Sequence, residues 1–573
     1  MARINRRNFV AGAGLTGLGL LVSNPGASAR ERTSLSRAVS PEGTTLTQVV
    51  SPVTPGPRYT RLAAGPGWPL VVRQDLAQAE AGRDDRRQAR SAFVQFTDLH
   101  IIDAESPVRA EYLHPYIGAA HRPQETLSPV AATALVQRVN NLAGGPFTGL
   151  PLDFMMTTGD NTDNHEHLEL SWFLEILNGG TVTPNSGDPH DYEGVQDSGN
   201  SWYWNPDTDL DDPYTAKGFP LIPGLLAAAT GRFTSPGLSI PWYCTFGNHD
   251  NTPEGTLPAN IPGMEHLYTG RIKVIGKDES TSRKLAAALE TPGASIPVTE
   301  LYGGDGIIRE VTPDERRTPF SMAEFVQAHL DPANTGPGPQ GHGFGSDNAD
   351  GQEVYYTFPI ADGITGLSLD TTNLAGWADG SIGLRQYLWV ERVLRAASST
   401  YYTFWGSKVT QDVTDELFVL FSHHTSTTMG NLLPDSRHPL EPRLDGATFV
   451  TLLNRFPNVL AWVNGHTHRN TVTPHRAETP QQGFWEINTA SHVDYPQLAR
   501  IVEVADNADG TLSLFTTLVE ADAPYAVDYG DDSTRALASL YRELSYNDIH
   551  ADLSRLGTER DRNTELLLAN PLH

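Results

Sequence analysis

Cysteine is nearly absent from the sequence, since Cys244 is the only one among 573 residues. A single thiol excludes an internal disulfide. Long uncharged apolar runs are also missing, and none reaches the ~20 residues that a membrane helix needs, so no membrane span is expected. Basic residues are few: 41 Lys and Arg stand against 68 Asp and Glu, for a net charge of −27. Binding to a nucleic-acid backbone is therefore not expected, because it requires clustered positive charge.

Glycine and proline are abundant, with 52 and 41 residues in the chain. Together they exceed the usual share of about 12%, which predicts much loop structure. Apolar residues make up 39% of the chain, enough for a large core. The length favours two to four domains, or one domain with long insertions.

The N-terminus carries a targeting pattern. Asn5-Arg6-Arg7-Asn8-Phe9-Val10 precedes an apolar run over residues 11–22 and the small residues Ala27-Ser28-Ala29. This pattern resembles a twin-arginine export signal, predicted over residues 1–29, with an amphipathic tail as the alternative. It implies a partner, the twin-arginine export machinery, and a periplasmic or extracellular protein that is soluble after cleavage. That route exports folded chains, which agrees with the lack of disulfides.

The next segments predict an arm followed by an α/β core. Residues 30–90 are rich in Ser, Thr, Pro and Arg, and we expect an N-terminal arm with little core of its own. Residues 93–97 and 153–158 read as strands. Between them, Ser128 and Pro129 offer an N-cap and a first-turn proline for a helix that ends at Gly144-Gly145. Strand, helix and strand in this order predict a parallel βαβ unit.

Two stretches, at about 179–240 and 251–352, interrupt this alternation of predicted strands and helices. Loops of this length are improbable in a compact domain unless they are lids or carry structure of their own. Strands resume at 354–358, 364–369, 417–421 and 459–463, with a helix at 384–397. A helix is also expected after Ser533, where Leu537, Leu540 and Leu544 have helical spacing. The predicted main domain covers 91–510, and 511–573 is predicted to be a C-terminal helical extension.

Five short polar blocks each follow one of the predicted strands. Ligand sites in open α/β sheets lie beyond the carboxyl ends of strands, so we expect the blocks to converge on one rim. They contain no thiolate, and therefore predict a metal with oxygen and nitrogen ligands. Alternate residues of a strand share a face, so Asp-x-His and His-x-His predict two clamps that hold two ions. The blocks are Asp98-Leu99-His100, Gly159-Asp160-Asn161-Thr162-Asp163, Gly247-Asn248-His249-Asp250, Ser422-His423-His424 and Gly465-His466-Thr467-His468.

These blocks, in this order, resemble the motifs of the calcineurin-like metallophosphoesterases over residues 93–500. A closer resemblance is to exported members that have a twin-arginine signal and long insertions between the motifs. The resemblance implies an α/β fold, a sandwich of two mixed β-sheets flanked by helices with long loop insertions. It also implies an exported dinuclear-metal phosphoesterase that hydrolyses a phosphomonoester or phosphodiester by attack of a metal-bridging hydroxide.

The resemblance also implies the ligands of two divalent ions, manganese, iron, zinc or similar. The two ions bring four positive charges against two carboxylates, so the site attracts a phosphoester substrate despite the acidic surface. Asp160 would bridge the ions. One ion would take Asp98, His100, Asp160 and His468, and the other Asp160, Asn248, His423 and His466. Within the Ser422-His423-His424 block, the resemblance favours His423 over His424.

His249 is implied as the proton donor to the leaving group, with Asp250 fixing its tautomer and raising its pKa. A turn carboxylate that caps a helix is the alternative for Asp250. Purple acid phosphatases carry Tyr three residues after the bridging Asp; Asp163 stands there, so no tyrosinate-bound ferric centre is expected. Arg316-Arg317 and Gly341-His342-Gly343 could reach the substrate, but a solvated pair and a hinge are favoured. The alternative function is a non-catalytic, metal-dependent protein that binds phosphate or glycan.

Overall fold

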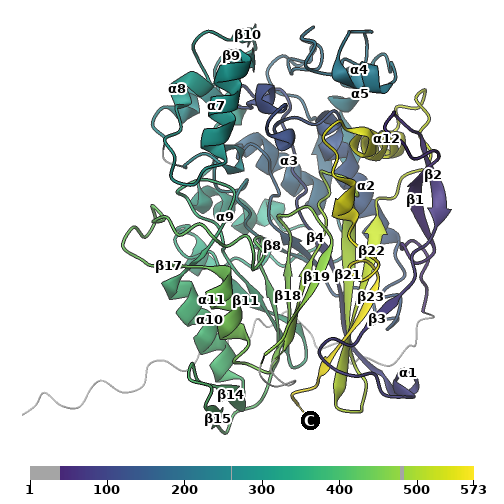
Figure 1. Ribbon diagram of the computed structural model, residues 1–573, viewed down its shortest axis with the longest axis vertical. Helices are drawn as coiled ribbons and strands as arrows, with labels where there is room; N and C mark the ends of the chain where they lie inside the picture. Colours follow the sequence, from purple (N-terminus) through teal and green to yellow (C-terminus); the bar gives the residue numbers. More distant parts are fainter. Residues whose placement is uncertain (1–38, 260, 478–482, 573) are drawn as a thin grey trace, which may run out of the picture. The chain divides into compact units, whose positions relative to one another are not determined.

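The computed structural model describes residues 39–259, 261–477 and 483–572. The predicted export signal lies outside the described residues. The described chain from residue 39 on is a mixed α/β structure built around two large sheets (Figure 1). Within the described ranges, no helix is long and apolar enough to cross a membrane.

The first sheet has seven strands and contains the predicted βαβ unit. Three neighbouring strands at one side of this sheet, β4, β5 and the edge strand β8, are parallel, with Val94 opposite Met155 and Thr157 opposite Cys244. Parallel strands end at the same edge, so the segments that follow them lie together. In spatial order the strands are β3 (Val71–Arg73), β23 (Thr564–Ala569), β22 (Thr511–Glu520), β21 (Leu498–Asp506), β4 (Gln88–Phe96), β5 (Met155–Thr158) and β8 (Trp242–Thr245).

The second sheet has six strands, and its four central ones, β12, β16, β18 and β20, are parallel. The helices α10 (Leu384–Ala396) and α11 (Gly446–Leu453) pack on it, with Val390 and Phe449 against Leu367 and Trp462. In spatial order its strands are β11 (Tyr356–Ala361), β12 (Ile364–Ser368), β16 (Leu417–Phe421), β18 (Val459–Asn464), β20 (Phe484–Asn488) and β19 (Thr471–His475).

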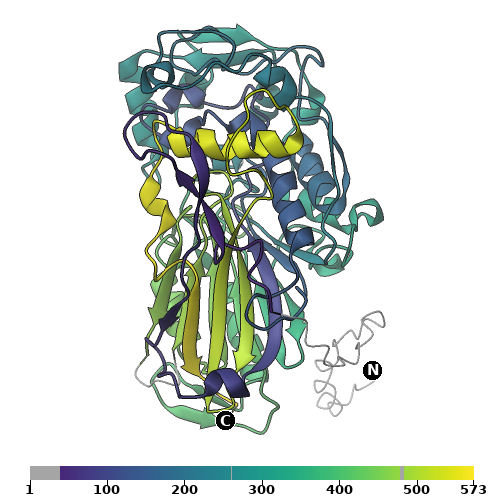
Figure 2. The same ribbon diagram turned by 90° about the vertical axis from the view of Figure 1, so that its right-hand side faces the viewer.

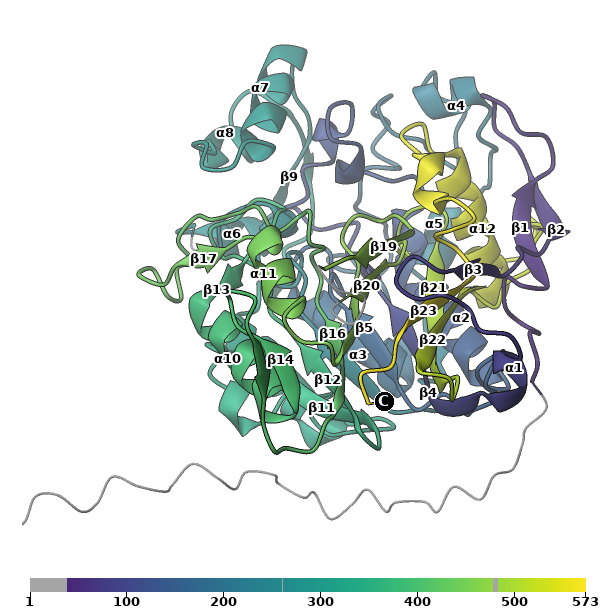
Figure 3. The ribbon, with the colours of Figure 1, turned by 60° about the horizontal axis from the view of Figure 1, so that its bottom comes forward.

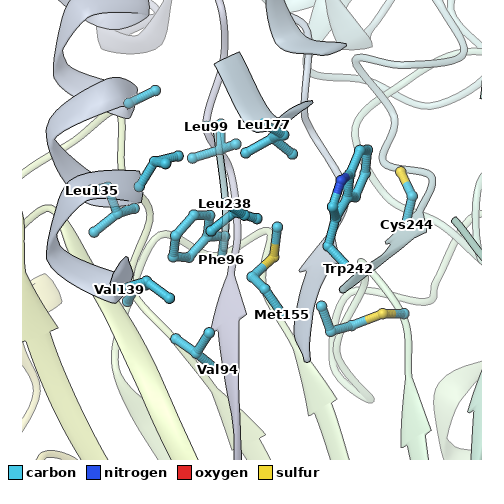
Figure 4. Close-up of a cluster of buried hydrophobic side chains, with 14 of the residues drawn as sticks. Val94, Phe96, Leu99, Leu135, Val139, Met155, Leu177, Leu238, Trp242 and Cys244 are labelled. Carbon is cyan, nitrogen blue, oxygen red and sulfur yellow. The ribbon is translucent and has the colours of Figure 1, made fainter. Parts of the chain in front are cut away.

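Apolar side chains fill the space between the sheets and around α2 (Ser128–Asn141). Phe93 of β4 packs edge-to-face on Phe421 of β16, with ring centroids 5.6 Å apart. Figure 4 shows Leu135 and Val139 of α2 facing the strands that carry Phe96 and Met155. Each fully buried side chain of this size stabilises the fold by roughly 1.5–3 kcal/mol.

The start of α2 differs from its prediction. Pro129 lies in the first turn as expected, but Ser128 is already helical. Its hydroxyl accepts a hydrogen bond from the Ile102 N–H at 3.0 Å instead of capping the helix. The helix ends at Asn141, before the glycine pair. Tertiary contact with the loop after the first block has displaced the local cap.

Both interruptions carry secondary structure of their own. The second one forms an apolar cluster in which Leu257, Tyr268 and Leu301 pack with Val108 and Tyr112. Figure 3 shows α7 (Glu279–Leu289) and α8 (Val298–Leu301) lying together next to β9 (Ile272–Gly276). The first interruption contains β6 (Gly180–Val182), α4 (Pro213–Lys217), α5 (Leu225–Ala229) and β7 (Phe233–Ser235). The second contains α6 (Met264–Tyr268), β9 (Ile272–Gly276), α7 (Glu279–Leu289), α8 (Val298–Leu301), β10 (Ile307–Glu310) and α9 (Met322–Leu330).

The two terminal segments are more integrated than their sequences predict. The arm supplies β3 to the first sheet, and Val50 and Leu62 are buried against Tyr495 and Tyr546. The C-terminal segment contains the expected helix α12 (Thr534–Asn547), which crosses beyond the strand ends in Figure 2. It also contains β22 and β23, so the boundary predicted at 510/511 falls inside the β21–β22 hairpin. Long-range pairing of buried strands, which is not visible in local sequence, explains both differences.

The remaining elements are short or peripheral, apart from α3 (His167–Asn178), which follows β5 in the chain. They are α1 (Arg83–Arg86), the β1–β2 hairpin (Gln48–Pro52 and Leu62–Pro66), the β13–β17 pair (Ile382–Gly383 and Arg443–Leu444) and the β14–β15 pair (Thr400–Tyr402 and Lys408–Thr410).

Candidate metal centre

All five polar blocks begin directly after strand ends of the two sheets. The first three follow β4, β5 and β8 of the seven-stranded sheet, and the other two follow β16 and β18 of the six-stranded sheet. Each sheet thus delivers ligands from its parallel strands, as the sequence predicts.

The structure brings together the four residues expected around one ion. Asp98, His100, Asp160 and His468 are buried, and one potential ligand atom of each lies within 4.8 Å of the others. His100 Nε2 is 3.5 Å from Asp160 Oδ2, and His468 Nε2 is 3.3 Å from Asp98 Oδ1. A cation between these atoms would have two carboxylates and two imidazoles around it.

The residues expected around the other ion meet at His423. Its Nε2 lies 3.1 Å from Asp160 Oδ2, 3.0 Å from Asn248 Oδ1 and 3.1 Å from His466 Nδ1. Asp160 Oδ2 therefore faces both groups, which is the geometry that a bridging carboxylate needs.

Hydrogen bonds at the Nδ1 atoms of His100 and His423, on the side away from the site, leave the Nε2 atoms free to bind cations. His100 Nδ1 lies 2.7 Å from Asp163 Oδ1, and His423 Nδ1 lies 2.8 Å from the Thr158 carbonyl oxygen. In each case Nδ1 donates its proton, so Nε2 presents a lone pair to the site. His100 Nε2 is buried with no hydrogen-bond partner among the described residues. A divalent cation would satisfy lone pairs that otherwise repel one another.

The electrostatics of the site favour positive charge. Burial lowers the pKa of His423, but Asp160 and Asp98 raise it more, to about 9. Burial raises the pKa of Asp160, but His423 and His249 lower it to well below its usual value. Without an ion the cluster therefore holds a proton at His423, and a bound metal would displace that proton.

The backbone of these blocks is strained. The φ angles are 50° at Asp98, 43° at His100, 51° at Asp160, 71° at His466 and 55° at His468. Residues other than glycine rarely adopt this left-handed region of backbone angles, and each residue that does so costs about 1–3 kcal/mol. The blocks converge past the strand ends, as expected, but the alternation on a strand face that was expected to form the two clamps does not apply there, because these ligands have left-handed backbone angles. As a result, His466 faces His423, whereas His468 faces Asp98.

Glycines make room for these turns. A Cβ on Gly465 would lie 1.9 Å from Thr97 Oγ1 and 2.5 Å from Asp98 Oδ2. A Cβ on Gly247 would lie 2.1 Å from Asp160 Oδ1. The glycine before each of these ligands therefore allows a carboxylate of another block to approach.

His249 and Asp250 do not form the expected pair. Asp250 accepts hydrogen bonds from the N–H groups of Asn161 at 3.0 Å, Thr162 at 2.9 Å and Gly247 at 2.9 Å. It joins two blocks, and these hydrogen bonds, not a contact with the His249 ring, account for its position. His249 Nδ1 bonds instead to the Asp163 carbonyl oxygen, at 2.7 Å. Burial lowers the pKa of His249 despite the nearby Asp160, whereas we expected it to be raised.

His424 lies close to His423 and His466, within metal-binding distance by geometry alone. Both of its ring nitrogens are already bonded, however. Nδ1 lies 2.9 Å from Thr371 Oγ1, and Nε2 lies 2.9 Å from the Ala378 carbonyl oxygen. We therefore keep His423 as the ligand of this block.

Two carboxylates that orient ligand histidines were not predicted from the sequence. Asp163 orients His100 and is paired with Arg109. Asp494 Oδ2 lies 2.6 Å from His468 Nδ1, and Arg122 donates to Asp494 at 2.7 Å. Asp163 could have been recognised by its place in the second block. Asp494 lies after β20 and outside the five blocks, so only the fold reveals it.

The site opens into a cavity of about 590 Å³, lined by His100, Asp160, Asn248, His249, His466 and His468. The residues of the second interruption that were weighed as substrate contacts, Arg316-Arg317 and Gly341-His342-Gly343, do not line this cavity. The favoured reading of a solvated arginine pair is wrong for Arg317. Arg317 is buried and donates to Ser186 Oγ, and His342 stacks on Trp242 with ring centroids 3.5 Å apart. Both have structural roles.

Two solved structures are similar to this chain at low sequence identity. The chain is similar to a dimetal phosphatase from Danio rerio, with 10% identity, a TM-score of 0.34, and coverage of 76% of this chain and 100% of that one. It is also similar to GAP50, the anchor in the inner membrane complex of Plasmodium, with 9% identity, a TM-score of 0.23, and coverage of 79% and 95%. No protein-family model and no curated protein matches the sequence.

Proposed function

We propose that the protein is a dinuclear-metal phosphoesterase that hydrolyses a phosphomonoester or phosphodiester. The observation that carries this proposal is the placement of Asp160 Oδ2 between two groups of inward-facing nitrogen and oxygen atoms. Two divalent ions, such as manganese, iron or zinc, would supply Lewis acidity and a water-derived nucleophile at neutral pH. The proposed ligands are Asp98, His100, Asp160, Asn248, His423, His466 and His468.

The chain's own residues prepare this chemistry. Asp163 and Asp494 hold His100 and His468 in the tautomer whose Nε2 faces the site. Because the proposed ligands include only two carboxylates, Asp98 and Asp160, two divalent ions leave the site positive and able to bind a phosphoryl group.

His249 is the proposed proton donor to the leaving oxygen. It lines the cavity, and its Nδ1 is bonded to the Asp163 carbonyl oxygen. Nε2 is therefore the atom that can exchange a proton with the substrate. A non-catalytic binding protein would have no use for such a group beside its ligands.

Two variants and two substrates test the proposal. We expect metal-loaded protein to hydrolyse bis- or mono-p-nitrophenyl phosphate. Asp160→Asn should lose both bound metal and rate. His249→Ala should keep its metal and lose about 10²–10⁴-fold in rate, mainly with poorer leaving groups such as phenyl phosphate. Elemental analysis checks the metal content of each variant. Full metal occupancy without turnover of any phosphoester would instead establish the binding protein.

Export is a separate part of the proposal, supported by the twin-arginine pattern in residues 5–10. Expression in a bacterium with and without this export machinery should yield a mature chain that begins near residue 30. An uncleaved chain in both strains would contradict it.

A further inference from the structure

The cavity at the candidate metal centre is much larger than a phosphoryl group. Its volume of about 590 Å³ lies within the 300–1,000 Å³ typical of pockets for small organic molecules. A phosphate group has only five heavy atoms. Most of the space beside the ligands is therefore available to another part of the bound molecule.

Much of the wall of this outer space is apolar and comes from two segments. Leu113 and Ile117 follow the first block in the chain, while Leu257, Leu289 and Leu301 belong to the second interruption. Leu113, Leu257 and Leu301 form part of the apolar cluster of that interruption. Ile117 and Leu289 are only partly buried against the cluster, so they present apolar surface to the cavity.

The charges along the cavity disfavour a second anion. Its three lining arginines are already paired, Arg109 with Asp163, and Arg122 and Arg555 with Asp494. Beyond Asp160 and Asp163 at the metal site, Glu254, Glu290 and Asp379 also line the cavity. Burial raises the pKa of Glu254 to about 8, so this group is mostly protonated at neutral pH and the negative charge comes from Glu290 and Asp379. An anionic group beyond the phosphoryl group would therefore find no unpaired arginine in the cavity lining, and it would meet the negative charge of Glu290 and Asp379.

We propose that the substrate carries an apolar alkyl or aryl group without a second anion, and that this group occupies the chamber formed by Ile117, Leu289 and their neighbours. The proposal rests on the proposed function, because the phosphoryl group is placed at the metals. It assigns a specificity role to the second interruption.

The first test measures the binding of alkylphosphonates, whose C–P bond resists hydrolysis. With metal-loaded protein, calorimetry should give dissociation constants that fall with each added methylene from methyl- to hexylphosphonate, by up to about fourfold per step. The dissociation constants of phenylphosphonate and hexylphosphonate, compared with each other, show whether the chamber prefers an aryl or an alkyl group. A flat series would overturn the proposal.

A matched pair of variants locates the effect. Leu289→Asn should remove most of the gain with chain length. Leu388→Asn, a leucine that is 43% exposed on α10 and outside this cavity, should retain it. Equal length dependence in both variants would show that the alkyl chain lies elsewhere.

The second test concerns charge. We expect 4-carboxyphenylphosphonate to bind at least about tenfold more weakly than phenylphosphonate. Asp379→Asn should narrow this difference, because it removes one of the lining carboxylates. Equal or tighter binding of the carboxylated compound by the unmodified protein would refute the exclusion of a second anion.

The two levels of the proposal fail differently. Turnover of phosphoesters with no dependence on the organic group would overturn the chamber and leave the phosphoesterase intact. Length-dependent phosphonate binding without turnover of any alkyl or aryl phosphate would support the chamber and overturn the enzymatic function.

Discussion

Replacing Asp163 by Asn tests whether the carboxylate behind His100 determines metal affinity. Asp163 Oδ1 lies 2.7 Å from His100 Nδ1 in a buried environment. Burial raises the pKa of Asp163, but Arg109 and His100 lower it to well below its usual value, so the group is ionised at neutral pH. Asn keeps the size and the backbone carbonyl that holds His249, but removes the negative charge.

The expected loss follows from the role of such a carboxylate. It makes the imidazole a stronger ligand, and its removal typically weakens metal binding by about 10–100-fold. This factor corresponds to roughly 1.4–2.8 kcal/mol. Only the group of Asp98, His100, Asp160 and His468 should respond directly, because His423 is oriented by the Thr158 carbonyl oxygen instead.

The assay is competition between the protein and a chromophoric chelator during titration with Mn²⁺ or Zn²⁺. We expect two binding steps, of which one weakens in Asp163→Asn. Asp494→Asn should weaken the same step, because Asp494 holds His468. The exposed Asp209→Asn is the matched control. If a folded Asp163→Asn variant binds both ions within twofold of the original affinities, the carboxylate bonded to His100 does not determine metal affinity, and the prediction is refuted.

Three further predictions concern packing, pH and metal removal. Gly465→Ala should cost about 1–3 kcal/mol and reduce metal content, because its Cβ would meet Asp98 Oδ2 at 2.5 Å; Gly56→Ala, which has open space, is the control for denaturation and elemental analysis. Burial raises the pKa of Glu125, but Arg109 and His121 lower it more, from 4.5 to about 2. Glu125 therefore stabilises the fold by about 3 kcal/mol above pH 4.5 and loses this contribution as the pH falls towards 2. The difference in unfolding free energy between the original protein and Glu125→Gln, measured with urea, should therefore be larger at pH 7 than at pH 3. Metal at about 100 times its dissociation constant should add about 2.7 kcal/mol of stability per site, and identical urea midpoints with and without chelator would contradict metal binding.

Much of the fold follows from local sequence. The strands at 364–369, 417–421 and 459–463 were predicted within a residue or two, because short apolar runs bounded by polar blocks have few alternatives. The pairing of strands was not predictable in the same way. β3, β22 and β23 join the first sheet from segments expected to be an arm and a helical extension.

The sequence by itself determined which residue types stand at the strand ends, and hence the nitrogen and oxygen character of the candidate site. Only the tertiary structure decided which of them act together. It placed Asp250 on backbone N–H groups, engaged both nitrogens of His424, and brought Asp494 to His468. The physical reason is that ligand direction depends on left-handed turns and buried hydrogen bonds between distant segments. These interactions have no local period in the sequence.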